Sequence, residues 1–113
     1  MLYYVYMGIQ ILAKKHFGKV KPFKTAKQME RHLKGIANHR RIEVLLKVAD
    51  RGGLSVDDLC AGAGCSYKTL AAHISKLVQA GLLDKKYLGR AVVHSLTPYG
   101  KTFGTFLRTF SHS

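Results

Sequence analysis

Acidic residues are scarce in this chain of 113 residues, which has six Asp and Glu against 19 Lys and Arg. Its formal net charge is +13 and its sequence pI is near 10.1. With so few carboxylates, and no pair of them placed for general acid–base catalysis, the sequence predicts no catalytic residue and no enzyme. The positive excess instead makes a polyanion the natural partner: DNA, RNA or an acidic membrane surface.

Long hydrophobic runs are also missing. The most apolar stretch is residues 1–13, MLYYVYMGIQILA, and Gly8 and Gln10 interrupt it. A membrane-spanning helix needs about 20 apolar residues, and a signal peptide carries its positive charge before its apolar run rather than after it. We therefore expect no membrane partner, and we expect this segment to bury its apolar face on the domain or on a partner subunit.

Cysteine occurs twice, at Cys60 and Cys65. This low count, with no sign of secretion, favours a reducing compartment and a cytoplasmic protein. Two thiols and scattered histidines do not supply the ligand spacing of a metal site. We expect both cysteines to pack as small apolar groups, and we predict no metal and no cofactor.

The positive charge is concentrated toward the N-terminus. Residues 14–41 contain ten basic residues and one acid, a balance of +9, whereas residues 42–113 contain nine basic and five acidic residues, a balance of +4. We interpret residues 1–24 as an apolar N-terminal segment followed by a basic arm, and residues 25–113 as one folded domain with a C-terminal dimerisation helix.

Apolar residues at helical spacing predict two helices between Thr25 and Gly53. The first stripe is Met29, Leu33, Ile36 and Ala37, and the second is Ile42, Leu45, Leu46 and Ala49. Gly52 and Gly53 end the second helix.

A short helix is then expected after Ser55, a glycine turn at residues 62–64, and a longer helix from Ser66 to Gly81, because each serine is a good N-cap. Beyond Gly81 the β-prone runs LLDKKYL and AVVHSL, separated by Gly89 and Arg90, predict a hairpin. Thr97-Pro98 starts a last helix. The predicted fold is mostly α with a small β-hairpin, in the order helix-helix-helix-helix-strand-strand-helix, which is a winged helix-turn-helix.

The region from about Asn38 to Thr97 carries a family resemblance. It rests on three stretches, the last of which runs on to Gly100: HRRIEVLLKVA, LSVDDLCAGAGCSYKTLAAHISKLVQAGLLDKK and GRAVVHSLTPYG. The chain resembles the ArsR-type winged helix-turn-helix transcription regulators, with MarR-like regulators as the second choice. The resemblance implies a dimer formed by the first and last helices. It also implies a sequence-specific regulator of transcription, with a recognition helix at about residues 66–79 in the major groove of double-stranded DNA and a wing at about residues 85–91 on the backbone or minor groove.

Candidate DNA contacts lie on these two elements. We expect Tyr67, Lys68 and Thr69 to be near base edges, Lys76 on a phosphate and Arg90 in the minor groove. The full set is Ser66, Tyr67, Lys68, Thr69, Ala72, His73, Ser75, Lys76, Lys85, Lys86 and Arg90. The plainer alternatives are that Tyr67 packs on the hairpin and that the lysines form an ordinary solvated face.

The last helix carries an apolar stripe that a small domain cannot easily bury, which points to an interface. Its residues are Tyr99, Phe103, Phe106, Leu107 and Phe110. We predict a nucleoid-associated homodimer. Two other functions stay open: a non-specific or architectural nucleic-acid-binding protein, with RNA as one target, and a winged-helix module for protein interaction.

Overall fold

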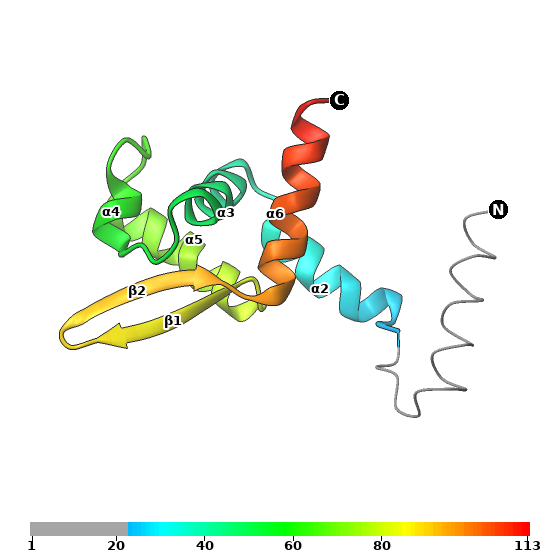
Figure 1. The fold of residues 1–113 in the computed structure, drawn as a ribbon, viewed down its shortest axis with the longest axis horizontal. Coiled ribbons are helices and arrows are strands. Elements are labelled where there is room, and N and C mark those ends of the chain that lie inside the picture. Colours follow the sequence, from blue (N-terminus) through cyan, green and yellow to red (C-terminus); the bar gives the residue numbers. More distant parts are fainter. Residues whose placement is uncertain (1–22) are drawn as a thin grey trace.

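The computed structural model describes residues 23–113, which form a helical body with a projecting hairpin (Figure 1). The elements are α2 (Ala26–Ile36), α3 (His39–Arg51), α4 (Val56–Cys60), α5 (Tyr67–Gln79), β1 (Leu83–Leu88), β2 (Ala91–Leu96) and α6 (Pro98–Ser111). This order confirms the predicted winged helix-turn-helix. Residues 1–22 of the predicted N-terminal segment and arm lie outside the described residues, and within residues 23–113 no helix is long and apolar enough to cross a membrane.

Each of the helices α2 to α6 starts at a short polar side chain whose oxygen accepts a backbone N–H of the first turn. These N-caps are Thr25, Asn38, Ser55, Ser66 and Thr97. Such caps stabilise a helix by about 1 kcal/mol each because they satisfy donors that have no partner inside the helix. The helix starts predicted at Ser55, Ser66 and Thr97 are therefore confirmed.

The core lies where α3 and α5 meet, next to the base of the hairpin. On α5 the buried side chains are Leu70, Ile74 and Leu77, as the helical spacing predicted. On α3 the buried side chains are Val44, Leu45 and Val48, whereas Ala49 is exposed. The buried face of α3 is therefore rotated about the helix axis relative to the predicted stripe. Two neighbouring stripes of this helix have similar hydrophobicity, and the contacts with α5 and β2 determine which of them is buried.

The buried face of α2 also differs from the predicted stripe. Its buried residues are His32, Gly35 and Ile36, whereas Met29 and Leu33 are 46% and 53% exposed. The reason is steric: a Cβ on Gly35 would collide with the Cβ of Ala80 at the end of α5. The helix therefore turns its glycine toward α5 and leaves its larger apolar side chains outside.

The hairpin is antiparallel, pairs Leu83 with Leu96 at its base and ends at Gly89, whose φ of 62° suits a tight turn. Two backbone hydrogen bonds between Leu54 and His94, of 3.1 and 2.7 Å, attach its base to the loop after α3. The rest of the hairpin extends away from α2 and α6 (Figure 1).

Two glycines of α6 provide a test of this packing. A Cβ on Gly100 would collide with the carbonyl oxygen of Leu82, whereas a Cβ on Gly104 would meet the Cβ of Ala49 at an ordinary 3.7 Å. We expect Gly100→Ala to lower the free energy of unfolding by about 2–3 kcal/mol, because backbone must shift. Gly104→Ala should be neutral or raise it by up to ~1 kcal/mol through helix propensity. Urea denaturation of both variants checks this, and equal effects would contradict it.

Candidate nucleic-acid interface

The outer face of α5 is open along its length. Lys68, Ala72, Ser75 and Lys76 are exposed, and more than half of Tyr67 is exposed at the start of the helix. These residues lie on one side because the apolar residues of the opposite side are fixed in the core. The helix contains no acidic residue. The structure thus brings these five predicted contacts together on one accessible, positively charged surface.

Ser66 and Thr69 are occupied with each other at the start of α5. The Ser66 hydroxyl accepts the Thr69 backbone N–H at 3.2 Å and donates to Thr69 Oγ1 at 2.9 Å. Both side chains remain exposed. Their first role is therefore to fix where α5 begins, and this sets the positions of the side chains in its first turn.

His73 lies at the edge of this face and contacts α3. Its Nδ1 accepts a hydrogen bond from Nε of Arg41 at 3.2 Å, and its side chain is half-buried. Burial, followed by the positive charge of Arg41, lowers the pKa of His73 from 6.5. The imidazole is neutral in this arrangement, because a protonated Nδ1 could not accept the bond.

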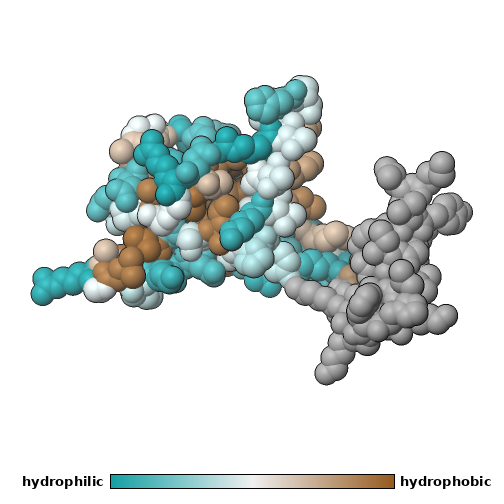
Figure 2. Space-filling model, viewed as in Figure 1, coloured by the Kyte–Doolittle hydropathy of each residue, from teal (hydrophilic) through white to brown (hydrophobic). Residues whose placement is uncertain are grey.

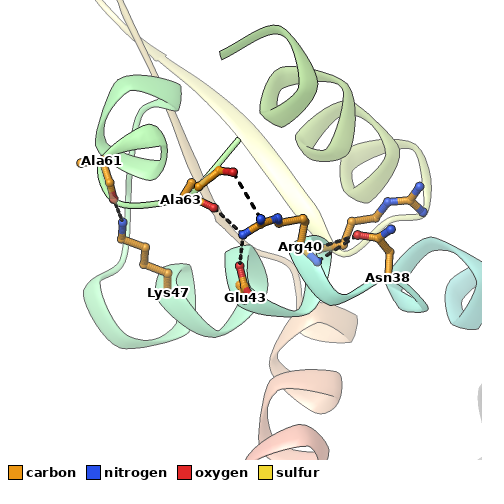
Figure 3. A network of polar contacts seen from close by, with 8 residues as sticks. Asn38, Arg40, Glu43, Lys47, Ala61 and Ala63 are labelled. Carbon is orange, nitrogen blue, oxygen red and sulfur yellow. Dashed lines mark hydrogen bonds and ion pairs between the residues drawn. The ribbon is translucent and has the colours of Figure 1, made fainter. Parts of the chain in front are cut away.

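The turn between α4 and α5 is held by two cations of α3 (Figure 3). Arg40 donates to the carbonyl oxygens of Ala63 at 2.5 Å and Gly64 at 3.3 Å, and it pairs with Glu43 at 3.4 Å. Lys47 donates to the carbonyl oxygen of Ala61 at 3.0 Å. Sequence reasoning missed this role, because the acceptors are backbone carbonyl oxygens and every residue has one.

The hairpin presents the remaining predicted contacts. Lys85, Lys86 and Arg90 are all exposed, with Arg90 in the turn. Lys85 and Lys86 are successive strand residues, so they point to opposite faces of the hairpin. The wing also exposes Tyr87 (70%) and Leu88 (59%) next to the turn, two side chains that sequence reasoning did not include.

The predicted interface residues of α6 divide into two groups. Tyr99, Phe103 and Leu107 are half-buried against the core of their own domain. Phe106 and Phe110 are 59% and 63% exposed, and their rings stack with centroids 5.6 Å apart. Apolar surface accordingly follows one side of α6 (Figure 2).

The two cysteines pack against the core as half-buried free thiols, as expected. In the described part of the chain, no three His, Cys, Asp or Glu side chains gather in a group that could hold a metal ion.

Residues 38–85 match the family model described as "Bacterial regulatory protein, arsR family". Among solved structures, HlyU from Vibrio cholerae has a TM-score of 0.71 at 25% identity, covering 81% of this chain and 100% of that one. The transcriptional regulator HlyU from Vibrio vulnificus has a TM-score of 0.65 at 27% identity, and the match covers 75% of this chain and 88% of that one.

A third neighbour shares the fold at 20% identity. It is the homodimeric winged helix-turn-helix DNA-binding domain Mb0332 from Mycobacterium bovis, described as a possible ArsR-family regulator. The TM-score is 0.66, and the match covers 76% of this chain and 80% of that one. No curated protein matches the sequence. The matches favour the first of the two predicted resemblances over the MarR-like one.

The lowered pKa of His73 makes stability depend on pH. Between the lowered folded pKa and 6.5, the unfolded chain binds more protons than the folded one. The contribution of neutral His73 is therefore complete above pH 6.5 and is lost as the pH falls toward the folded pKa. Urea denaturation at pH 7.5, 6.5 and 5.5 should show a difference between wild type and His73→Gln that changes with pH.

The control is His112→Gln, at an exposed histidine of the C-terminus. This variant measures the change that the loss of an exposed imidazole causes by itself. A profile for His73→Gln that runs parallel to that of the wild type would contradict the lowering of the His73 pKa by burial and by the charge of Arg41.

Proposed function

We propose that this chain, whose residues 38–85 match the arsR-type model, is a DNA-binding transcription regulator that reads a specific sequence in double-stranded DNA as a homodimer. In this proposal α5 enters the major groove, with Tyr67 and Lys68 nearest the base edges. The hairpin carries Arg90 to the flanking backbone or minor groove. A cytoplasmic, nucleoid-associated location follows from this function.

The single observation that carries the proposal is the outer face of α5. It is exposed from Tyr67 to Lys76, contains no carboxylate and is fixed in orientation by the buried side of the same helix. An α-helix of this kind fits the major groove, which is about 12 Å wide. The small side chain of Ala72 on this face leaves base recognition to few residues, so contacts with the backbone and the shape of the DNA contribute to specificity.

Dimerisation is proposed to use α6 together with α2. Phe106 and Phe110 on α6, and Met29 and Leu33 on α2, are exposed apolar side chains. Such groups usually mark an interface when they gather on a small domain. A two-fold dimer would place its two α5 helices on half-sites about 34–36 Å apart, one turn of the DNA helix.

Substitution of Lys68 tests the DNA-binding surface. Lys68→Gln should weaken binding to the preferred site by about 5- to 150-fold, because a good base contact contributes about 1–3 kcal/mol. Its binding to unrelated DNA should change much less. The matched control is Lys101→Gln, an exposed lysine of α6, which should bind as the wild type does. Footprinting and titration with a labelled duplex provide the measurement.

A wild-type footprint with no preferred sequence would instead support the architectural alternative. If wild type and Lys68→Gln both failed to bind any duplex, the protein-interaction alternative would gain, since α6 would then be the functional surface.

The dimer is tested by introducing charge on α6. Phe110→Glu should convert the dimer to a monomer in sedimentation equilibrium, because burying an unpaired carboxylate at an apolar interface costs much free energy. Tyr87→Glu introduces the same charge at an aromatic residue that is 70% exposed on the wing, and it should leave the dimer intact. A monomeric wild type, or dissociation by both variants, would count against the proposed interface.

A further inference from the structure

A basic cleft lies beside α5, outside the set of contacts that the sequence predicted. It has a volume of about 460 Å³, and the cations that line it are Arg31, Lys34, Arg41 and Lys76. They come from α2, α3 and α5, so only the tertiary fold brings them together. Arg31, Lys34 and Arg41 belong to the basic N-terminal stretch of the sequence, yet they are part of the folded domain next to the recognition helix.

The floor of the cleft is a close contact between two helices. Gly35 of α2 meets Ala80 at the end of α5, and there is no room for a side chain on Gly35. This contact fixes α2 against α5 and so sets the spacing of the cations on either side. The cleft is therefore a product of packing rather than a run of neighbouring lysines.

The arginines of the cleft are held by main-chain oxygens instead of carboxylates. Arg31 donates to the carbonyl oxygen of Gln79 at 2.7 Å, and Arg41 donates to those of Lys34 at 3.3 Å and Gly35 at 3.2 Å. Carbonyl groups orient a guanidinium without cancelling its full charge. Each arginine has five N–H donors, so both keep donors for an anion.

No carboxylate lines the cleft. Glu30 is not part of its lining, but it pairs with Lys34 at 3.0 Å on an exposed surface. Such a pair is weak and is screened by salt. The net charge of the cleft is thus strongly positive, and a phosphate group is the anion for which arginine and lysine together are best suited.

We propose that this cleft binds the phosphodiester backbone of the duplex that α5 reads. The proposal rests on the proposed function and extends its interface to α2. Lys76 belongs both to the exposed face of α5 and to the cleft. It lies eight residues after Lys68, a rise of about 12 Å along the helix, which equals the width of the major groove. With Lys68 at the base edges, Lys76 and the cleft come to the groove edge, where the phosphates lie.

Two variants of α2 test the proposal in the full chain. Lys34→Gln removes one cation, and the double variant Arg31→Gln, Lys34→Gln removes two. Binding to the preferred duplex and to an unrelated duplex is measured from about 50 to 200 mM salt. In a plot of log affinity against log salt concentration, we expect each lost phosphate contact to make the slope shallower by about 0.9. The loss of affinity between about 50 and 200 mM salt then becomes about 3.5-fold smaller for each contact removed. Affinity should fall similarly for both duplexes, because phosphates carry no sequence information.

The control is Lys101→Gln on α6, which should leave both slope and affinity unchanged. If the double variant disturbs the fold in circular dichroism, Lys34→Gln alone decides the test. Within residues 23–113 the one polar partner of the Lys34 ammonium is the exposed Glu30. Wild-type slopes in both α2 variants would overturn the proposal. Lys68→Gln would still test the recognition helix by its loss of sequence preference, so the two failures are distinguishable.

A second arm separates DNA from a free phosphate ligand. Inorganic pyrophosphate at millimolar concentration is added to the wild type and to the double variant in a thermal denaturation experiment. If pyrophosphate stabilises only the wild type while the variant retains wild-type affinity for both duplexes, the cleft serves a free anion and the proposal is wrong.

Discussion

The packing of α5 against α3 determines what this protein can present to DNA. Leu70, Ile74 and Leu77 are fixed in the core, and burial of each such side chain contributes about 1.5–3 kcal/mol. A helix anchored on one side by three large side chains cannot rotate without exposing them. The outward direction of Lys68 and Lys76 is therefore a consequence of core packing rather than of any contact that these lysines make.

The shortage of acids shapes the polar interactions of the fold. With 19 basic residues and six acidic ones, most cations in the described domain cannot find a carboxylate. Arg31, Arg41 and Lys47 instead donate to main-chain oxygens, mostly at helix ends and in the turn. Arg40 does so as well, in addition to its ion pair with Glu43. Carbonyl groups at helix C-termini carry partial negative charge, so they orient cations while leaving them positive. The same residues thereby stabilise the helix-turn-helix and keep its surface attractive to a polyanion.

The sequence predicted the elements well because their signals are local. Ser55, Ser66 and Thr97 each start a helix, and Gly81 and Gly89 adopt positive φ at the turns. Caps and turns depend on the backbone within a few residues, and one residue type is strongly favoured at each. The exposed face of α5 was also predictable, since a single apolar stripe at helical spacing defines its opposite side.

Other features depended on contacts between distant residues. The sequence by itself determined the order of the elements, the faces of α5 and the positive charge. Only the tertiary structure decided that Gly35 rather than Leu33 faces α5, that His73 accepts a bond from Arg41, and that Arg31 lies beside Lys76. The physical reason is that an apolar stripe or a charge limits which contacts a residue can make, whereas its actual neighbour is selected by the steric fit between helices that are distant in the sequence.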